Sequence, residues 1–146
     1  MGPIKVIKVG LVRDAIKPHD HRKTIKGPAD VVGWVQDEAH SDREMFIVLH
    51  LNARNVGLRK EVISIGTLNA SLVAPREVFK SAVKENAAAI ILVHNHPSGD
   101  LTPSKDDQDL TDRIKKAGEI MGIDVLDHVI IGPGGGWLSM KERGLL

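Results

Sequence analysis

The chain has 146 residues and a formal net charge of +1, with 42% hydrophobic and 27% charged residues. These values are typical of one globular domain and exclude a disordered chain, a collagen-like fibre and a coiled coil. The absence of cysteine excludes a disulfide scaffold and a thiolate zinc finger, and the nearly neutral charge gives no overall field for nucleic acid. The longest uninterrupted apolar run, residues 87–93, is too short to span a membrane, and the N-terminus shows no signal-peptide pattern. We therefore expect a cytoplasmic protein without membrane association.

Residues 1–26 form a basic leading segment that we assign to the same domain as the rest of the chain. Seven Lys or Arg side chains against two Asp give this segment a charge of +5, and the remainder of the chain carries −4. The β-branched residues around 4–12 predict an edge strand, which would allow pairing with a second copy in a homodimer. Two interpretations of the charge stay open, namely a solvated strand and loop, or an arm that docks on an acidic partner.

Helices and strands are expected to alternate through residues 27–146. Val31, Val32, Trp34 and Val35 follow Pro28 at helical spacing, which predicts a helix over residues 28–40. Two strands then follow around a turn and form a hairpin, the first of them apolar at nearly every position, as in a strand covered on both faces. The ranges of these two strands are 45–51 and 58–65.

The second half of the chain continues the alternation. A helix begins at Pro75, a buried strand covers residues 88–94, and a longer helix runs from about Ser104 to Met121, where Gly122 ends it. The last expected strands cover residues 123–131 and 137–140. The sequence therefore predicts an α/β fold, a single-domain mixed-sheet sandwich with flanking helices.

Two histidines at the end of the buried strand are the strongest candidates for chemistry. His94 and His96 are two residues apart, so in an extended backbone both side chains lie on the same face. Neutral imidazole is a common zinc ligand, and the Gly- and Pro-containing loop would bring the carboxylate of Asp107 over the histidines. Three protein ligands leave one tetrahedral position for water, as in catalytic zinc sites. We expect one zinc ion per chain, although these ligand types do not separate zinc from manganese or iron.

Two further residues are candidate catalytic groups. Glu61 lies in the middle of a largely apolar strand, where a charged side chain is unusual and therefore suggests a functional role. A carboxylate is suited to take a proton from a metal-bound water. Ser104 precedes the helix that carries Asp107, and its hydroxyl is suited to donate a hydrogen bond to the oxyanion formed when a carbonyl is attacked.

Each candidate also has a structural interpretation. Residues 104–107 are typical of a helix N-cap followed by acids in the first turn. Glu61 alone is compatible with a solvated strand residue. Asp127 and His128 are either a polar pair at a strand end or partners that orient metal ligands from behind.

The joint pattern of Glu61, His94-x-His96, Ser104 and Asp107 resembles the JAMM motif of the JAB/MPN metalloprotease superfamily. The flanking segments are similar to the RadC-like branch, which is often described as a DNA repair family, and the similarity covers residues 25–146. These segments are GTLN at 66–69, PREVF at 75–79, HNHPSG at 94–99 and LDHVI at 126–130.

This resemblance implies a fold, an activity and a set of roles. The implied fold is the cytidine-deaminase-like α/β sandwich of JAB domains, and the implied activity is zinc-dependent hydrolysis of peptide or isopeptide bonds. Position by position, the zinc ligands fall on His94, His96 and Asp107, the general acid/base on Glu61, and the oxyanion helper on Ser104. The implied partner is a protein or peptide substrate.

Two departures from the pattern bear on the function. The chain lacks the N-terminal helix-hairpin-helix region of longer RadC proteins, so it is expected to be a short form in which DNA binding is weakly supported. Asn95 stands between the histidines, where ubiquitin-cleaving members favour Ser or Thr, so ubiquitin-like substrates are not implied. The competing hypotheses are a DNA-repair-associated nucleic-acid-binding protein and a non-catalytic metal-binding module.

Overall fold

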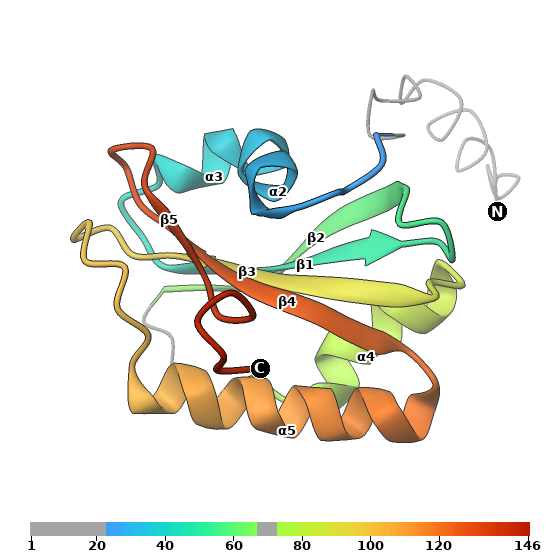
Figure 1. Ribbon diagram of the computed structural model, residues 1–146. Helices are drawn as coiled ribbons and strands as arrows, with labels where there is room; N and C mark the ends of the chain where they lie inside the picture. Colours follow the sequence, from blue (N-terminus) through green and yellow to red (C-terminus); the bar gives the residue numbers. More distant parts are fainter. Residues whose placement is uncertain (1–22, 67–72) are drawn as a thin grey trace, which may run out of the picture.

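Residues 23–66 and 73–146 are described by the computed structural model, and they form one five-stranded sheet with helices on both faces (Figure 1). The strand order is β2-β1-β3-β4-β5, with β3 and β4 parallel and the other neighbours antiparallel. The mixed sheet and the α/β class expected from the sequence are confirmed. The elements are α2 (Pro28–Trp34), α3 (Gln36–Ala39), β1 (Met45–Leu51), β2 (Gly57–Ile65), α4 (Pro75–Lys84), β3 (Ala89–Asn95), α5 (Lys105–Met121), β4 (Asp124–Ile131) and β5 (Trp137–Ser139).

The predicted hairpin is present as β1 and β2. β1 lies between β2 and β3 and is covered by helices on both faces, which explains why nearly every position is apolar. The turn between the strands is shaped by Asn52, whose Oδ1 accepts the backbone N–H groups of Arg54 at 2.9 Å and Val56 at 3.0 Å.

The single helix predicted over residues 28–40 is wrong, because two short helices, α2 and α3, meet at Val35. Val35 leaves the helical conformation with φ −113° and ψ 23°, and its side chain is completely buried. Gly33 and the β-branched Val35 are both poor helix formers, so little helical propensity opposes the break. The break directs Val35 into the core on this face of the sheet.

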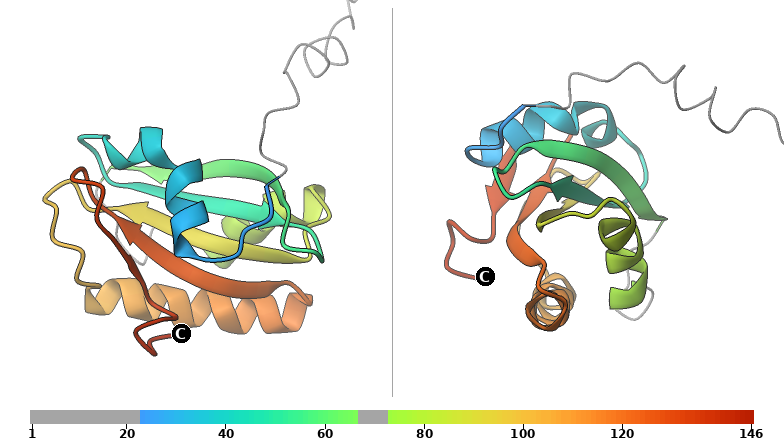
Figure 2. Two further views of the ribbon diagram at one scale, coloured as in Figure 1. Left: turned by 45° about the horizontal axis from the view of Figure 1, so that its top comes forward. Right: turned by 90° about the vertical axis from the view of Figure 1, so that its right-hand side faces the viewer.

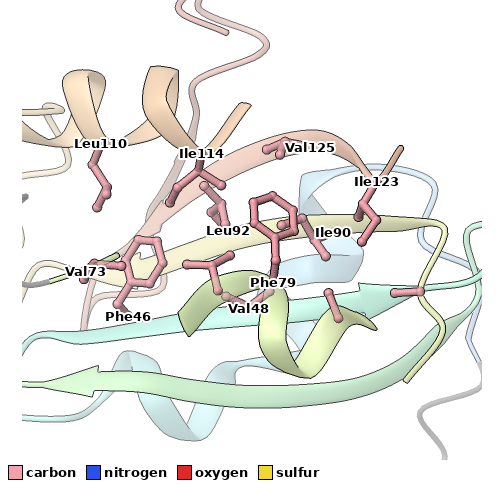
Figure 3. Packing of buried hydrophobic residues seen from close by; sticks show 13 residues of the cluster. Phe46, Val48, Val73, Phe79, Ile90, Leu92, Leu110, Ile114, Ile123 and Val125 are labelled. Carbon is pink, nitrogen blue, oxygen red and sulfur yellow. The ribbon is translucent and has the colours of Figure 1, made fainter. Parts of the chain in front are cut away.

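The two faces of the sheet carry separate hydrophobic cores. The end-on view in Figure 2 shows helices covering both faces. Along β1, Phe46 and Val48 point toward α4 and α5, whereas Ile47 and Leu49 point toward α2 and α3. Figure 3 shows the first cluster, in which Phe79 of α4 packs among strand and α5 side chains. The sheet is therefore held from both sides.

The crossover from β3 through α5 to β4 creates the edge at which polar residues gather. Because β3 and β4 are parallel, α5 must run back along the sheet between them. The carboxyl end of β3 and the amino end of α5 therefore lie at the same edge, on the left in Figure 1. Gly122 ends α5 in the left-handed conformation with φ 73°, as the sequence predicts.

Most of the basic leading segment, including the expected edge strand and the homodimer pairing through it, lies outside the described residues. At its described end, Thr24 forms a β-bridge with Val56, and the Ile25 N–H donates to the Asn55 carbonyl at 2.8 Å. Among the described residues, every helix is too short or too polar to serve as a membrane span.

Candidate metal centre

Three side chains predicted as metal ligands meet at the carboxyl end of β3. His94 Nε2 lies 2.7 Å from His96 Nε2 and 3.3 Å from Asp107 Oδ1, and His96 Nε2 lies 3.5 Å from Asp107 Oδ2. In the part of the chain that the structure describes, this is the one cluster of His, Asp and Glu whose donor atoms are close enough to share a metal ion. His94 and Asp107 are buried and His96 is partly exposed, so the cluster reaches solvent through His96.

Two of the three donor spacings match a tetrahedral ion. Zinc bonds of about 2.0–2.1 Å place neighbouring ligand atoms about 3.3 Å apart, close to the 3.3 and 3.5 Å spacings from the histidines to Asp107, whereas the 2.7 Å between the two histidine nitrogens is shorter. The donor chemistry agrees, because His96 Nδ1 lies 2.5 Å from the carbonyl oxygen of Asp100, which can only accept a hydrogen bond. Neutral His96 therefore carries its proton on Nδ1 and has its Nε2 lone pair free for a metal ion, whereas charged His96 donates from Nε2 to His94 across the 2.7 Å contact. A lone pair beside a carboxylate is suited to bind a cation.

Asp107 is held in place by the start of its own helix. Its Oδ2 accepts the Ser104 backbone N–H at 2.8 Å, and its own N–H donates to Ser104 Oγ at 3.0 Å. This reciprocal capping box satisfies two helix N–H groups and leaves Asp107 Oδ1 directed at His94. The N-cap interpretation of this segment and the ligand interpretation are thus compatible. Ser104 is exposed, and its O–H hydrogen is not used by the cap, so its predicted donor role stays compatible with the geometry.

The electrostatics of the cluster favour the metal-binding forms of His94 and Asp107 at neutral pH and oppose that of His96. Burial lowers the pKa of His94 to about 4, against the opposing charge of Asp107. Burial would raise the pKa of Asp107, but hydrogen bonding to His96, the charge of His94 and the bonds from Ser104 together hold it below its ordinary value. Hydrogen bonding to Asp107 raises the pKa of His96 despite partial burial. At pH 7 the cluster therefore contains a neutral His94 and a charged carboxylate.

The side chains of Asp127 and His128 point to opposite faces of β4. His128 Nε2 lies 2.8 Å from His94 Nδ1, directly behind a predicted ligand. The carboxylate of Asp127 instead accepts hydrogen bonds from Ser139 Oγ at 2.5 Å, from the His128 N–H at 2.7 Å and from the Lys141 N–H at 3.0 Å. His128 thus contacts the metal cluster, whereas Asp127 fixes the backbone between β4 and β5.

Glu61 lies on the same face of the sheet as His94 but at some distance from it. Glu61 is opposite Val48 in the register of β1 and β2, whereas His94 is opposite Phe46 on the other side of β1. Two strand spacings and two residues of stagger separate the Cα atoms of Glu61 and His94 by about 12 Å. The Glu61 carboxylate lies 4.0 Å from Arg59 Nε, and it is not among the clustered donor atoms. Its catalytic role stays a prediction.

Glu44 is an acidic residue near the cluster that the sequence reasoning missed. It directly precedes β1, and its charge adds to the larger effect of Asp107 in raising the pKa of His96. Asn95 fixes this segment, because its Oδ1 accepts the Met45 N–H at 2.7 Å and its Nδ2 donates to the Arg43 carbonyl at 2.9 Å. An acidic residue beside an apolar strand was the available signal, but only the pairing of β1 with β3 brings it near the histidines.

An open pocket of about 500 Å³ lies beside the cluster. Its lining carries both signs of charge and includes the residue that follows the second histidine ligand. The lining residues are Asp42, Arg43, Glu44, Gly66 and Pro97. The pocket adjoins the cluster through Pro97, the chain neighbour of His96.

Comparison with known proteins agrees with this geometry. The family model for the RadC-like JAB domain matches residues 25–145. The chain belongs to the RadC-like JAB domain family. The resemblance found in the sequence is thereby confirmed, and the five-stranded mixed sheet with flanking helices is that of the JAB/MPN fold.

Curated relatives share about half of their aligned residues with this chain. A UPF0758 protein of Desulforamulus reducens is 50% identical over 152 residues, covering 100% of this chain and 66% of the relative. A UPF0758 protein of Rubrobacter xylanophilus is 51% identical over 126 residues, covering 86% of this chain and 55% of the relative. One from Desulforudis audaxviator is 47% identical over 151 residues, with 99% and 65% covered. The chain thus spans between half and two thirds of the length of these RadC-like relatives.

Proposed function

We propose that this RadC-like JAB domain is a zinc-dependent hydrolase that cleaves peptide or isopeptide bonds, a metallopeptidase of the JAMM type. The observation that carries the proposal is the convergence of His94, His96 and Asp107 at the carboxyl end of a buried strand. Three protein ligands that leave a fourth position open are typical of catalytic zinc. Protein or peptide substrates and a cytoplasmic location are part of the same proposal.

The chemistry divides between the ion and the chain. Zinc bound at this cluster supplies Lewis acidity and a water of lowered pKa. The chain would supply two imidazoles, of which His94 is already neutral, and a charged carboxylate, which Ser104 holds through the capping box. The exposed hydroxyl of Ser104 is available to donate to the oxygen of an attacked carbonyl.

Two carboxylates are candidates for moving the proton. Glu61 fits the spacing of the sequence motif, whereas Glu44 lies near enough to His96 for its charge to raise the pKa of that ligand. A general base must come within hydrogen-bond reach of the proton that it takes, directly or through one water. Glu44 is therefore a second candidate beside Glu61, and the two glutamates are distinguishable by substitution.

Metal binding is tested first, by native mass spectrometry on untagged protein purified without added metal. We expect about one zinc per chain in the wild type and a loss of zinc in Asp107→Asn, which removes the ligand charge at nearly constant volume. Asp106→Asn is the matched control, because Asp106 lies in the same first turn of α5 but is exposed. A wild type that stays metal-free in excess zinc at pH 7.5, or an Asp107→Asn protein that retains its zinc, would overturn the assignment.

Catalysis is tested with a peptide and isopeptide library, using wild type, Glu44→Gln and Glu61→Gln. The glutamate that moves the proton should lose about 100-fold or more in turnover while the protein keeps its zinc, and the other variant should stay within a few-fold of wild type. Full activity in both variants would contradict the mechanism. A zinc-loaded wild type that cleaves nothing in the library would favour the non-catalytic metal-binding module instead.

A further inference from the structure

A buried chain of hydrogen bonds connects Asp107 to His94 behind the metal cluster. Thr111 Oγ1 lies 2.6 Å from the backbone carbonyl oxygen of Asp107 and 2.5 Å from His128 Nδ1. The other ring nitrogen of His128, Nε2, lies 2.8 Å from His94 Nδ1. All four residues are buried, and Thr111 and His128 have no exposed surface. The chain thus starts and ends on two different predicted ligands.

The direction of each hydrogen bond follows from counting hydrogens. The carbonyl oxygen of Asp107 carries no hydrogen, so the 2.6 Å contact requires the hydroxyl hydrogen of Thr111. Met140 Sδ, at 3.7 Å, is a much weaker acceptor for that hydrogen. With its hydrogen committed, Thr111 Oγ1 can only accept at its second contact. The hydrogen between Thr111 and His128 therefore sits on His128 Nδ1.

The same count extends to His94. His128 is completely buried, and its ring nitrogens meet only a hydroxyl and a second imidazole, an environment that favours the neutral ring. With its single hydrogen on Nδ1, the Nε2 of His128 must accept, so the hydrogen between the two rings sits on His94 Nδ1. The Nε2 of His94 is then left with its lone pair, directed at His96 and Asp107.

We propose that Thr111 and His128 are positioning residues that fix His94 in its Nδ1–H tautomer and thereby commit its Nε2 to the metal. The inference rests on the metal site of the proposed function. The usual partner behind a histidine ligand is a carboxylate, carbonyl or water. Here the partner is a neutral imidazole. The chain of hydrogen bonds ends on a backbone carbonyl, which accepts a hydrogen bond at any pH. Asp107 and Thr111 are one turn apart on α5. The same hydrogen bonds therefore link the predicted ligand Asp107 to the predicted ligand His94.

The test combines zinc affinity with the tautomers of the metal-free protein. Thr111→Val keeps the side-chain shape but removes the hydroxyl, whereas Thr111→Ser keeps the hydroxyl. In competition with a chromophoric chelator, Thr111→Val should bind zinc about 10–100-fold more weakly than wild type, and Thr111→Ser within about threefold of it. Long-range ¹H–¹⁵N spectra of the apo wild type should show His94 and His128 both protonated on Nδ1. In Thr111→Val, the His94 signals should shift toward the Nε2–H form.

Ser81→Ala is the matched control for loss of a buried hydroxyl. Ser81 Oγ lies 3.0 Å from His50 Nε2, so the variant also breaks a buried hydroxyl–histidine contact, but one away from the metal cluster. It should lower stability and leave zinc affinity unchanged. A purely structural role for Thr111 would make Thr111→Val behave in the same way.

Two results would overturn the inference. One is a Thr111→Val protein with wild-type zinc affinity and an unchanged His94 tautomer. The other is an apo wild-type spectrum in which His94 or His128 is protonated on Nε2, a measurement that needs no variant to fold. If the wild type binds no zinc, the proposed function fails, whereas the apo tautomers still decide whether the hydrogen-bond chain exists. If zinc binds but no peptide is cleaved, the affinity comparison is unaffected.

Discussion

The packing of α5 on the sheet makes Gly118→Ala a sharp test of the fold. A Cβ on Gly118 would lie 2.5 Å from the backbone carbonyl oxygen of Ile123, and 3.3 Å from side-chain atoms of Phe79 and Val125. The 2.5 Å contact cannot be relieved by a side-chain rotation, because the obstructing atom is backbone. The added methyl group therefore forces α5 away from β4 or distorts the turn that joins them.

The size of the effect follows from two opposing contributions. Overpacking of a well-filled core costs about 1–3 kcal/mol. Replacing a helical glycine by alanine returns about 0.5–1 kcal/mol, because alanine loses less conformational entropy on folding. Taking the middle of each range gives a net loss of about 1 kcal/mol, which corresponds to a fall in Tm of roughly 2–4 °C for a domain of this size.

Thermal unfolding followed by circular dichroism measures this shift. Gly33→Ala is the matched control, since Gly33 is also helical but its added Cβ would meet no heavy atom within 4 Å. The control should raise the Tm slightly or leave it unchanged. A Gly118→Ala protein as stable as Gly33→Ala would show that α5 does not pack on β4 as described.

Three other substitutions test the core, the clamp beside the site and a buried titrating group. Asn95→Ala removes the side-chain partners of the Met45 N–H and the Arg43 carbonyl, so it should lower the free energy of unfolding in urea by about 1–3 kcal/mol. An unchanged urea midpoint would show that Asn95 does not hold this segment. Burial lowers the pKa of His50, so the unfolded chain binds the proton more readily; the stability linked to His50 is complete above its ordinary pKa of 6.5 and is lost as pH falls below it. His50→Gln should flatten this acid part of the stability curve, and a curve parallel to that of wild type would contradict the assignment. Leu92→Ala should lower the free energy of unfolding by about 2–5 kcal/mol, and Leu58→Ala, at an exposed position, by much less. Equal losses would contradict the burial of Leu92 in the core.

The sequence by itself determined most of the elements and the residues of the candidate metal cluster. Strong apolar periodicity placed six of the elements within a residue or two, because β1 and β3 are covered on both faces and the helices carry one apolar stripe. The predicted ligands were also readable from the sequence, since His94 and His96 share a strand face and Asp107 belongs to a capping box of adjacent residues. These features depend on neighbours in the sequence, which local backbone geometry relates directly.

The tertiary structure decided which distant residues join the site. The helix breaks at Val35 because the Val35 side chain is buried against the sheet. The helical spacing of apolar residues over 28–40 does not show this break. His128 reaches His94, and Glu44 comes near His96, only because β1 and β4 both pair with β3, in a register that the strands do not show individually. Strand order and register are set by the joint packing of both cores, so they depend on contacts between residues far apart in the chain. The groups around the ligands therefore become visible only when the sheet is assembled.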